Sequence, residues 1–392
     1  MNLFDLILVF LAIGYGVSGY RQGFLVGALG VAGLIGGGLA GALLAPVILD
    51  QFAPSVTVSL IALALVLGGA LLGQTVGASL GGALRDRVTW RPAHVVDAGA
   101  GAVLSVVAML VVAWILGSAV ASAQFGEVSR SVRMSQVLAT VDRFMPRGAE
   151  QALLAFSRVV DPGLFPRYLE PFASEQITPA QPPTAGVLKD PDVVRAGRSV
   201  VRVTGVALRC SRSLEGSGFV YAPGRVMTNA HVVAGISEPK VETRSGRSYD
   251  ARVVLYDPDR DVAVLAVPDL SLPALPLDAG AESGHQGAVL GYPGNGPFWA
   301  GPARVRGEQR LQGPDIYGGR MVVRDVFSLY AQVRPGNSGG PLVSPEGTVT
   351  GLVFAASVED NRTGYALTVN EILNDARAGA KATAPVSTGG CA

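Results

Sequence analysis

The sequence predicts two different parts, an N-terminal bundle of four transmembrane helices followed by an all-β domain built as a double barrel. Hydrophobic residues make up 49% of the 392 residues and charged residues only 16%, against about 25% charged in a typical soluble domain. The long apolar runs lie in the first 125 residues. From Ser199 onward the pattern changes to short β-rich runs separated by Gly, Pro, Asp and Asn, which is typical of barrels and sandwiches.

Four apolar runs are long enough to cross a bilayer, which takes about 20 residues. They predict helices at Leu3–Tyr20, Phe24–Leu44, Val56–Leu84 and Gly99–Ala123. The first run has no basic start and no small-residue cleavage site, so we interpret it as a retained helix and not as a signal peptide. Arginines occur in the loops after the first and third runs and are absent from the loop after the second. Because basic loops stay in the cytoplasm, the chain after Ala123 is predicted to lie on the extracytoplasmic side. The protein as a whole is predicted to cross the inner membrane several times.

Glycines recur at every fourth residue in the second and third runs, at Gly33, Gly37 and Gly41 and at Gly69, Gly73, Gly77 and Gly81. Such a face lets two helix backbones approach closely. Packing within one bundle explains this, and a homo-oligomer or a membrane partner is the alternative. His94 and Asp97 could form a proton-linked site, although a solvated helix end explains them better. This block, residues 1–125, resembles the colicin V production protein family.

Residues 126–192 are predicted to form a stalk. Val128–Arg143 and Gly148–Val160 have the periodicity of amphipathic helices. The run Thr178–Thr184 is rich in proline and polar residues, which predicts a semi-rigid spacer. A regulatory cap over an active site is an alternative without support in the sequence.

Three short motifs in the β-rich part carry chemistry. His231 lies in Thr-Asn-Ala-His-Val-Val, Asp261 ends Asp-Pro-Asp-Arg-Asp, and Ser338 lies in Gly-Asn-Ser-Gly-Gly-Pro. A serine hydroxyl needs an imidazole to take its proton, and a buried carboxylate orients that imidazole. Asp261 is favoured over Asp257 and Asp259 because it directly precedes an apolar strand. Each motif alone could be a structural histidine, a solvated loop or a turn, but the three occur in the order His, Asp, Ser of one known protease type.

These segments resemble those of trypsin-like serine proteases, in particular the bacterial high-temperature-requirement branch. The resemblance implies a chymotrypsin-like double β-barrel at residues 193–392, with the N–H groups of Gly336 and Ser338 as the oxyanion hole. Asn337 replaces the aspartate that pairs with a new N-terminus in zymogen activation, and Gln332 stands where trypsin has its specificity aspartate. The expected substrate-binding edge is Val353, Phe354, Ala355 and Ala356. No PDZ domain is expected after the barrel.

The two cysteines, Cys210 and Cys391, are predicted to form a disulfide, because the topology places them in an oxidising compartment. The bond would close a loop of about 180 residues, which the chain-entropy model credits with roughly 5 kcal/mol. Two free thiols are the alternative. Whether the bond regulates activity stays open.

The whole architecture resembles the MarP family, the membrane-bound acid-resistance serine proteases of mycobacteria and related actinobacteria. This implies an extracytoplasmic endopeptidase that acts on cell-envelope proteins under acid or oxidative stress. An imidazole base, with an unperturbed pKa of about 6.5, would work less well in acid. The alternatives are a membrane scaffold or sensor whose barrel binds peptides without cleaving them, and a transporter with a protease-like appendage. No metal or cofactor is expected, since the cysteines and histidines lack zinc spacing, and a net charge of +1 favours no nucleic acid.

Overall fold

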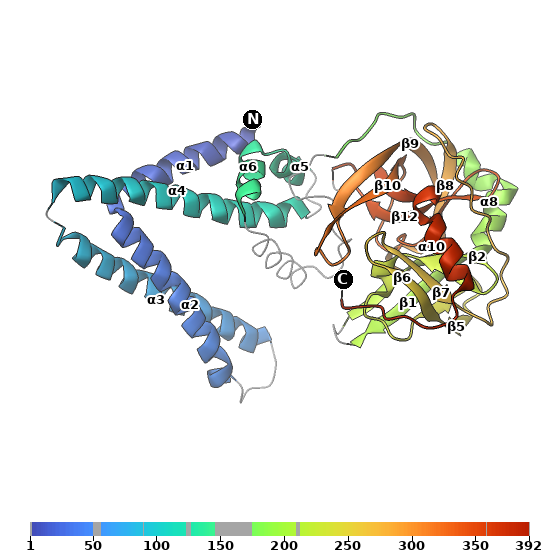
Figure 1. The fold of residues 1–392 in the computed structure, drawn as a ribbon, viewed down its shortest axis with the longest axis horizontal. Coiled ribbons are helices and arrows are strands. Elements are labelled where there is room, and N and C mark those ends of the chain that lie inside the picture. The colour runs from blue at the N-terminus through green and yellow to red at the C-terminus, as the bar shows by residue number, and fades with distance from the viewer. Residues whose placement is uncertain are drawn as a thin grey trace. The chain divides into compact units, whose positions relative to one another are not determined.

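The computed structural model describes residues 2–49, 56–88, 90–122, 127–145, 175–208, 212–357 and 359–391. The chain forms two compact units, Met1–Ser118 with Met134–Phe144, and Ala119–Arg133 with Met145–Ala392. Long helices make up most of the first unit, and the strands of the described chain lie in the second (Figure 1). The domain boundaries at residues 125 and 192 remain predictions.

Within the described ranges, four helices are long and apolar enough to cross a membrane. They are α1 (Leu3–Gln22), α2 (Phe24–Leu49), α3 (Val56–Arg85) and α4 (Arg91–Ser122). The four predicted helices are therefore confirmed. Helix α4 begins at Arg91 and not at Gly99, and Pro92 lies in its first turn, where a missing N–H costs no hydrogen bond.

Asp97 lies inside α4, and its carboxylate binds the ends of two other helices. The prediction that it belongs to a solvated helix end is therefore wrong. Its carboxylate accepts a hydrogen bond from the N–H of Leu25 at 3.0 Å and pairs with Nε of Arg85 at 3.0 Å. Arg85 in turn donates to the carbonyl of Arg21 at the end of α1, at 2.6 Å. Residues of four helices therefore meet around one ion pair.

The glycine faces of α2 and α3 pack against each other. A Cβ added at Gly37 would overlap the Gly69 carbonyl, and one at Gly33 would overlap the Gly73 carbonyl. Packing within the bundle therefore uses these faces. An association of copies through the helices stays a prediction and would need another surface.

The single helix predicted at Val128–Arg143 is wrong, because the chain forms α5 (Glu127–Arg133) and α6 (Gln136–Phe144). The Ser135 hydroxyl accepts from the N–H of Leu138 at 3.1 Å and donates to the Asp5 carboxylate at 2.6 Å. Serine in this capping position starts a new helix. The second predicted helix, Gly148–Val160, lies outside the described residues.

The first β-sheet has seven strands in the order β5-β4-β1-β2-β3-β7-β6. Only Ala251 separates the two edge strands, β5 and β6, along the chain, so the sheet curls back towards itself. The strands are β1 (Val200–Ala207), β2 (Arg212–Ala222), β3 (Arg225–Thr228), β4 (Lys240–Glu242), β5 (Ser248–Asp250), β6 (Arg252–Asp257) and β7 (Val262–Ala266).

The second sheet is a closed barrel in the order β10-β13-β12-β11-β8-β9. Its interior is apolar and fully buried at Val289, Leu329 and Val353. Its strands are β8 (Gln286–Gly291), β9 (Trp299–Pro314), β10 (Met321–Tyr330), β11 (Pro341–Val343), β12 (Val349–Ala356) and β13 (Thr363–Thr368). Four long helices followed by two curled β-sheets confirm the predicted fold class.

Two flanking segments contact the barrels. The Pro-rich run expected to be a spacer lies against the second barrel, since the Thr178 carbonyl accepts from Arg306 at 3.0 Å and the Thr184 N–H donates to Gln286 at 3.2 Å. After β13, helix α10 (Val369–Lys381) contacts β6 and β7 of the first sheet. The tail that follows binds β6 of the first sheet, where the Val386 N–H donates to the Val253 carbonyl at 2.9 Å, and the loop after His231, where the Thr388 carbonyl accepts from the N–H of Gly235 at 3.1 Å.

Candidate active site

His231 and Asp261 form a closely bonded pair. His231 lies on the one-turn helix α9 (Ala230–Val233), and Asp261 directly precedes β7. Nδ1 of the imidazole lies 2.7 Å from Oδ2 of Asp261, and the backbone N–H of His231 donates to Oδ1 at 2.9 Å. The Asp261 side chain is fully buried and that of His231 is 12% exposed. Because an ionised carboxylate only accepts, Nδ1 carries the proton and Nε2 is left as the basic nitrogen.

Asp261 adopts a left-handed backbone conformation with φ of 64°, which is unfavourable for a residue with a side chain, by about 1–2 kcal/mol. The buried Asn229 amide holds it, because Nδ2 donates to the Asp261 carbonyl at 2.8 Å. Asn229 is the residue before α9, yet its side chain makes no capping hydrogen bond to that helix. The Asp261 carboxylate binds the helix N–H instead, so the two segments hold each other.

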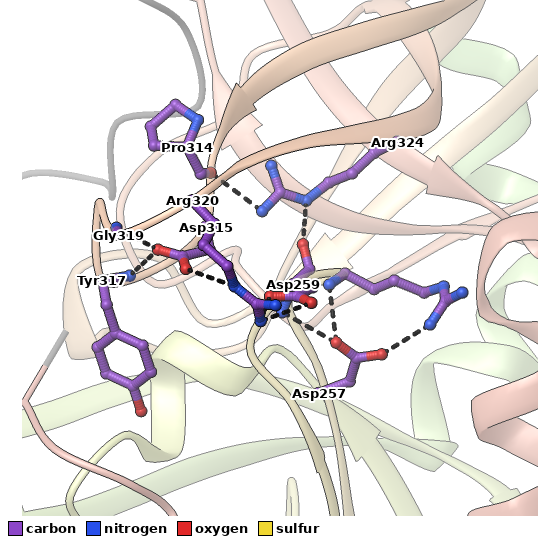
Figure 2. A network of polar contacts seen from close by, with 9 residues as sticks. Asp257, Asp259, Pro314, Asp315, Tyr317, Gly319, Arg320 and Arg324 are labelled. Carbon is purple, nitrogen blue, oxygen red and sulfur yellow. Dashed lines mark hydrogen bonds and ion pairs between the residues drawn. The ribbon is translucent and has the colours of Figure 1, made fainter.

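The loop before Asp261 is also held from the second barrel, as Figure 2 shows. Nε of the buried Arg324 on β10 donates to the Asp259 carbonyl at 2.7 Å. The Asp259 carboxylate accepts two hydrogen bonds from Arg320, at 2.6 and 2.8 Å, and Asp257 accepts from Arg260 at 2.8 Å. Asp257 and Asp259 therefore bind arginines, whereas Asp261 faces His231.

Ser338 is 3% exposed and lies in a loop whose carbonyl groups are individually bonded. The Pro335 carbonyl accepts from Gly294 at 2.8 Å, and the Asn337 carbonyl accepts from Gly340 at 2.9 Å. In a planar trans peptide the N–H points opposite to the C=O. The N–H groups of Gly336 and Ser338 therefore point away from these partners, and neither donates to an acceptor among the described residues.

Gly336 needs to be glycine because φ is 92° and an added Cβ would lie 2.5 Å from the Tyr292 carbonyl. Strand β2 brings this loop close to the histidine. The Ser217 N–H donates to the Ser338 carbonyl at 2.8 Å. A Cβ at Gly216 would lie 2.6 Å from Val232, the neighbour of His231, and 3.0 Å from the Ser338 carbonyl.

The expected substrate-binding residues lie at the end of β12. Pairing with β11 ends at Leu352, whereas pairing with β13 continues to Ala356. Val353 is still bonded on that side, since its N–H donates to the Gly340 carbonyl at 2.9 Å and its carbonyl accepts from the Gly339 N–H at 2.8 Å. Beyond Val353, no strand of the described chain pairs with this side of β12. Val353, Phe354 and Ala355 are buried and Ala356 is partly exposed. Gln332 is exposed and accepts a hydrogen bond from Arg334 at 2.8 Å.

The remaining candidates from the sequence are the two cysteines, His285 and possible metal ligands. Cys210 lies outside the described residues, and Cys391 is not a free cysteine. His285 is exposed in a turn, where Nδ1 accepts from the N–H of Glu282 at 2.9 Å. Over the described ranges, no group of three His, Cys, Asp or Glu side chains could hold a metal ion.

Sequence reasoning missed Ser217, Asn229 and Arg324. A signal exists for Asn229, which lies two residues before His231 in the histidine motif. Ser217 lies between two glycines in a strand that also carries Arg212 and Glu215, so the sequence does not single it out. The sequence offers no comparable signal for Arg324, whose partners lie about 10 and 65 positions away.

Residues 4–146 match the family Colicin V production protein, and residues 216–352 match the Trypsin-like peptidase domain. Serine protease Rv3671c of Mycobacterium tuberculosis (strain ATCC 25618 / H37Rv) is 39% identical over 391 residues, 99% of this chain and 98% of the relative. Protease Do-like 1, chloroplastic, of Arabidopsis thaliana is 30% identical over 191 residues, 44% of this chain and 43% of the relative. The crystal structure of the active form of Rv3671c protease from M. tuberculosis superposes with a TM-score of 0.54 at 47% identity, covering 57% of this chain and 98% of the solved one.

The β-rich fold and these matches define a serine endopeptidase with a trypsin-like domain. The chain belongs to the MarP family of serine proteases, with a colicin V production region ahead of the peptidase domain.

Proposed function

We propose that this chain is a membrane-anchored serine endopeptidase in which Ser338 is the nucleophile, His231 the general base and Asp261 the residue that orients the base. The observation that carries the proposal is the buried Asp261 carboxylate, which binds both Nδ1 and the backbone N–H of His231. This leaves Nε2 to take the Ser338 proton and return it to the leaving amine.

The N–H groups of Gly336 and Ser338 would stabilise the oxyanion of the tetrahedral intermediate. Neither group donates to an acceptor among the described residues, which supports this role. Removing one such donor typically costs about 3–4 kcal/mol of the activation barrier.

Substrate would bind as an added strand along the end of β12, at Val353, Phe354, Ala355 and Ala356. Three of these side chains are buried, and the Val353 N–H and carbonyl bind Gly340 and Gly339. The substrate would therefore contact mainly the backbone that follows Val353. Gln332 offers no charge to a basic side chain, which favours cleavage without a requirement for Lys or Arg.

The four apolar helices would anchor the enzyme in the lipid bilayer of the inner membrane, and the position of the arginine-bearing loops supports a protease on the extracytoplasmic side. Its substrates would then be proteins and peptides of the cell envelope. Protease added to intact spheroplasts should digest an epitope at residue 392 and spare one inserted between α3 and α4. The reverse pattern would contradict this topology.

A disulfide between Cys210 and Cys391 fits this compartment. Cys391 is not free, and Cys210 is the other cysteine of the chain. Peptide mapping without reductant should recover the two as one linked peptide. Recovery of alkylated Cys210 and Cys391 would refute the bond.

A role in acid or oxidative stress follows from the family. One feature of the protease unit supports function in acid, because burial raises the pKa of Asp375 to about 6 and protonation of this carboxyl stabilises the fold. The test is survival at low pH of cells that carry Ser338→Ala in place of the parent enzyme.

Labelling of the full-length chain in detergent with a fluorophosphonate probe tests the catalytic assignment directly. We expect labelling at Ser338 that is lost in Ser338→Ala and falls at least 1,000-fold in His231→Ala. Asp261→Asn should lose far more reactivity than Asp259→Asn, because the Asp259 carboxylate binds Arg320 and not the histidine.

A folded chain that no fluorophosphonate labels would contradict the assignment. It would favour the alternative of a scaffold or sensor that binds peptides without cleaving them.

A further inference from the structure

Ser217 is buried and all its polar groups are bonded. Its hydroxyl donates to the Gly336 carbonyl at 2.6 Å and accepts from the Tyr292 N–H at 2.9 Å. Its backbone N–H binds the Ser338 carbonyl at 2.8 Å. Its own carbonyl accepts from the Thr228 hydroxyl at 2.7 Å. The side chain is therefore fixed, and its single proton is directed at Gly336.

The Gly336 carbonyl belongs to the one peptide between the two proposed oxyanion donors. The neighbouring carbonyls, of Pro335 and Asn337, are held by backbone N–H groups, whereas Gly336 depends on a side chain. Glycine rotates more freely than any other residue. Without the Ser217 hydroxyl, this peptide keeps only the hydrogen bond from its Asn337 N–H to the Arg334 carbonyl, at 3.0 Å. The Gly336 carbonyl can then turn towards the space between the two oxyanion donors, where its partial negative charge would oppose an oxyanion.

We infer that Ser217 is a positioning residue for the oxyanion-binding loop, with its hydroxyl holding the Gly336 carbonyl so that the Gly336 and Ser338 N–H groups stay available to the substrate. The inference rests on the proposed catalytic function. It adds a residue that touches neither substrate nor His231 and acts through the loop.

Gly291 provides a second way to perturb the same contact. A Cβ at this position would lie 2.6 Å from the Ser217 hydroxyl oxygen. Gly291→Ala should therefore displace the Ser217 hydroxyl while the serine itself is kept. Its effect on the reaction rate should resemble that of Ser217→Ala.

Ser199 supplies a matched control. It is as buried as Ser217, and its hydroxyl donates to the Pro273 carbonyl at 2.7 Å. Ser199→Ala therefore removes the same kind of buried hydrogen bond, with a comparable expected loss of thermal stability, and leaves the Gly336 carbonyl untouched.

The experiment compares these full-length variants in detergent, using the second-order rate of fluorophosphonate labelling and the turnover of a simple aryl ester against pH. Ser217→Ala and Gly291→Ala should lower the labelling rate and kcat by about 10- to 100-fold. KM should stay within about two-fold, as expected for an interaction made mainly in the transition state. The acid side of the pH–rate profile should not move, because the histidine and its aspartate are unchanged. Ser199→Ala should react at nearly the parent rate.

Equal losses in Ser217→Ala and Ser199→Ala would overturn the inference and indicate general destabilisation. A shifted acid side in Ser217→Ala would also overturn it, because the damage would then reach His231. Hydrogen exchange of residues 334–340 gives a readout without catalysis, and it should rise in Ser217→Ala and not in Ser199→Ala. If the parent enzyme does not react at Ser338, the proposed function fails, and exchange alone decides whether Ser217 holds the loop.

Discussion

Asp375 lies on α10, where this helix packs against β6 and β7, and only 9% of it is exposed. Its pKa is raised from 3.8 to about 6, chiefly by burial and also by the neighbouring Asp257 and Glu371, while Arg260 opposes the increase. Among the described residues, Oδ2 of this carboxyl has no hydrogen-bond partner. We predict that Asp375→Asn stabilises the protease unit at pH 8 and gives no gain at pH 4.

The sign follows from proton linkage. Because the pKa is higher in the folded state than in the unfolded one, the folded state holds the proton more tightly. The stability contributed by this proton is fully present below pH 3.8 and is lost as the pH rises through about 6. Asparagine resembles the protonated acid in shape and does not ionise, so the variant avoids the loss.

A shift of roughly 2 pKa units, at about 1.36 kcal/mol per unit, limits the cost of the ionised group to about 3 kcal/mol. Residual contact with water and the charge of Arg260 reduce it, so we expect a gain of about 1–2 kcal/mol at pH 8, or roughly 3–6 °C in the unfolding midpoint. Calorimetry of the full-length chain in detergent at pH 4 and pH 8 measures this. The exposed Asp269→Asn is the matched control. A less stable Asp375→Asn at pH 8, or an equal gain at both pH values, would refute the reasoning.

Asn229→Ala should lower the rate of fluorophosphonate labelling by about 10-fold or more, because it frees the Asp261 carbonyl from its amide partner. Asp261 should remain buried in a crystal structure of the variant. Arg324→Met should destabilise the protease unit by about 2–4 kcal/mol in calorimetry, since it removes a buried guanidinium and leaves the Asp259 and Pro314 carbonyls without their donor. Gly37→Ala should lower the midpoint of the helical unit or expose it to proteolysis, because the methyl group would overlap a carbonyl of α3. The adjacent Gly36→Ala has open space around it and should have little effect.

The sequence predicted those features that depend on residues close together in the chain, either in a short motif or in a periodic apolar run. Four apolar runs set the helices, and three short motifs identified His231, Asp261 and Ser338 as the candidate triad. Asp261 could be preferred to Asp257 and Asp259 because it borders an apolar strand, and the structure places it against the histidine. The catalytic role of these residues remains a proposal.

The features that could not be predicted, such as the break between α5 and α6 and the contact of Ser217, depend on side chains from distant segments. A local sequence pattern does not reveal such contacts. Ser135 ends one helix and begins another by binding Asp5, 130 positions away. Ser217 holds a carbonyl 119 positions away, although Gly-Ser-Gly in a strand is read most easily as a turn. The prediction of a solvated helix end at Asp97 is wrong for the same reason, since the partner of Asp97, Arg85, belongs to another helix.

The tail bonds of the first barrel have a consequence for biosynthesis. The Val386 N–H binds the Val253 carbonyl, the Gly235 N–H binds the Thr388 carbonyl, and the Thr388 hydroxyl binds the Ile236 carbonyl. The first sheet is synthesised before the second barrel, yet its last hydrogen bonds form with the C-terminal tail. Two of these bonds lie just after α9, the helix that carries His231. A nascent or truncated chain without residues 386–388 lacks these bonds, so this side of the protease unit is completed only after they have been synthesised.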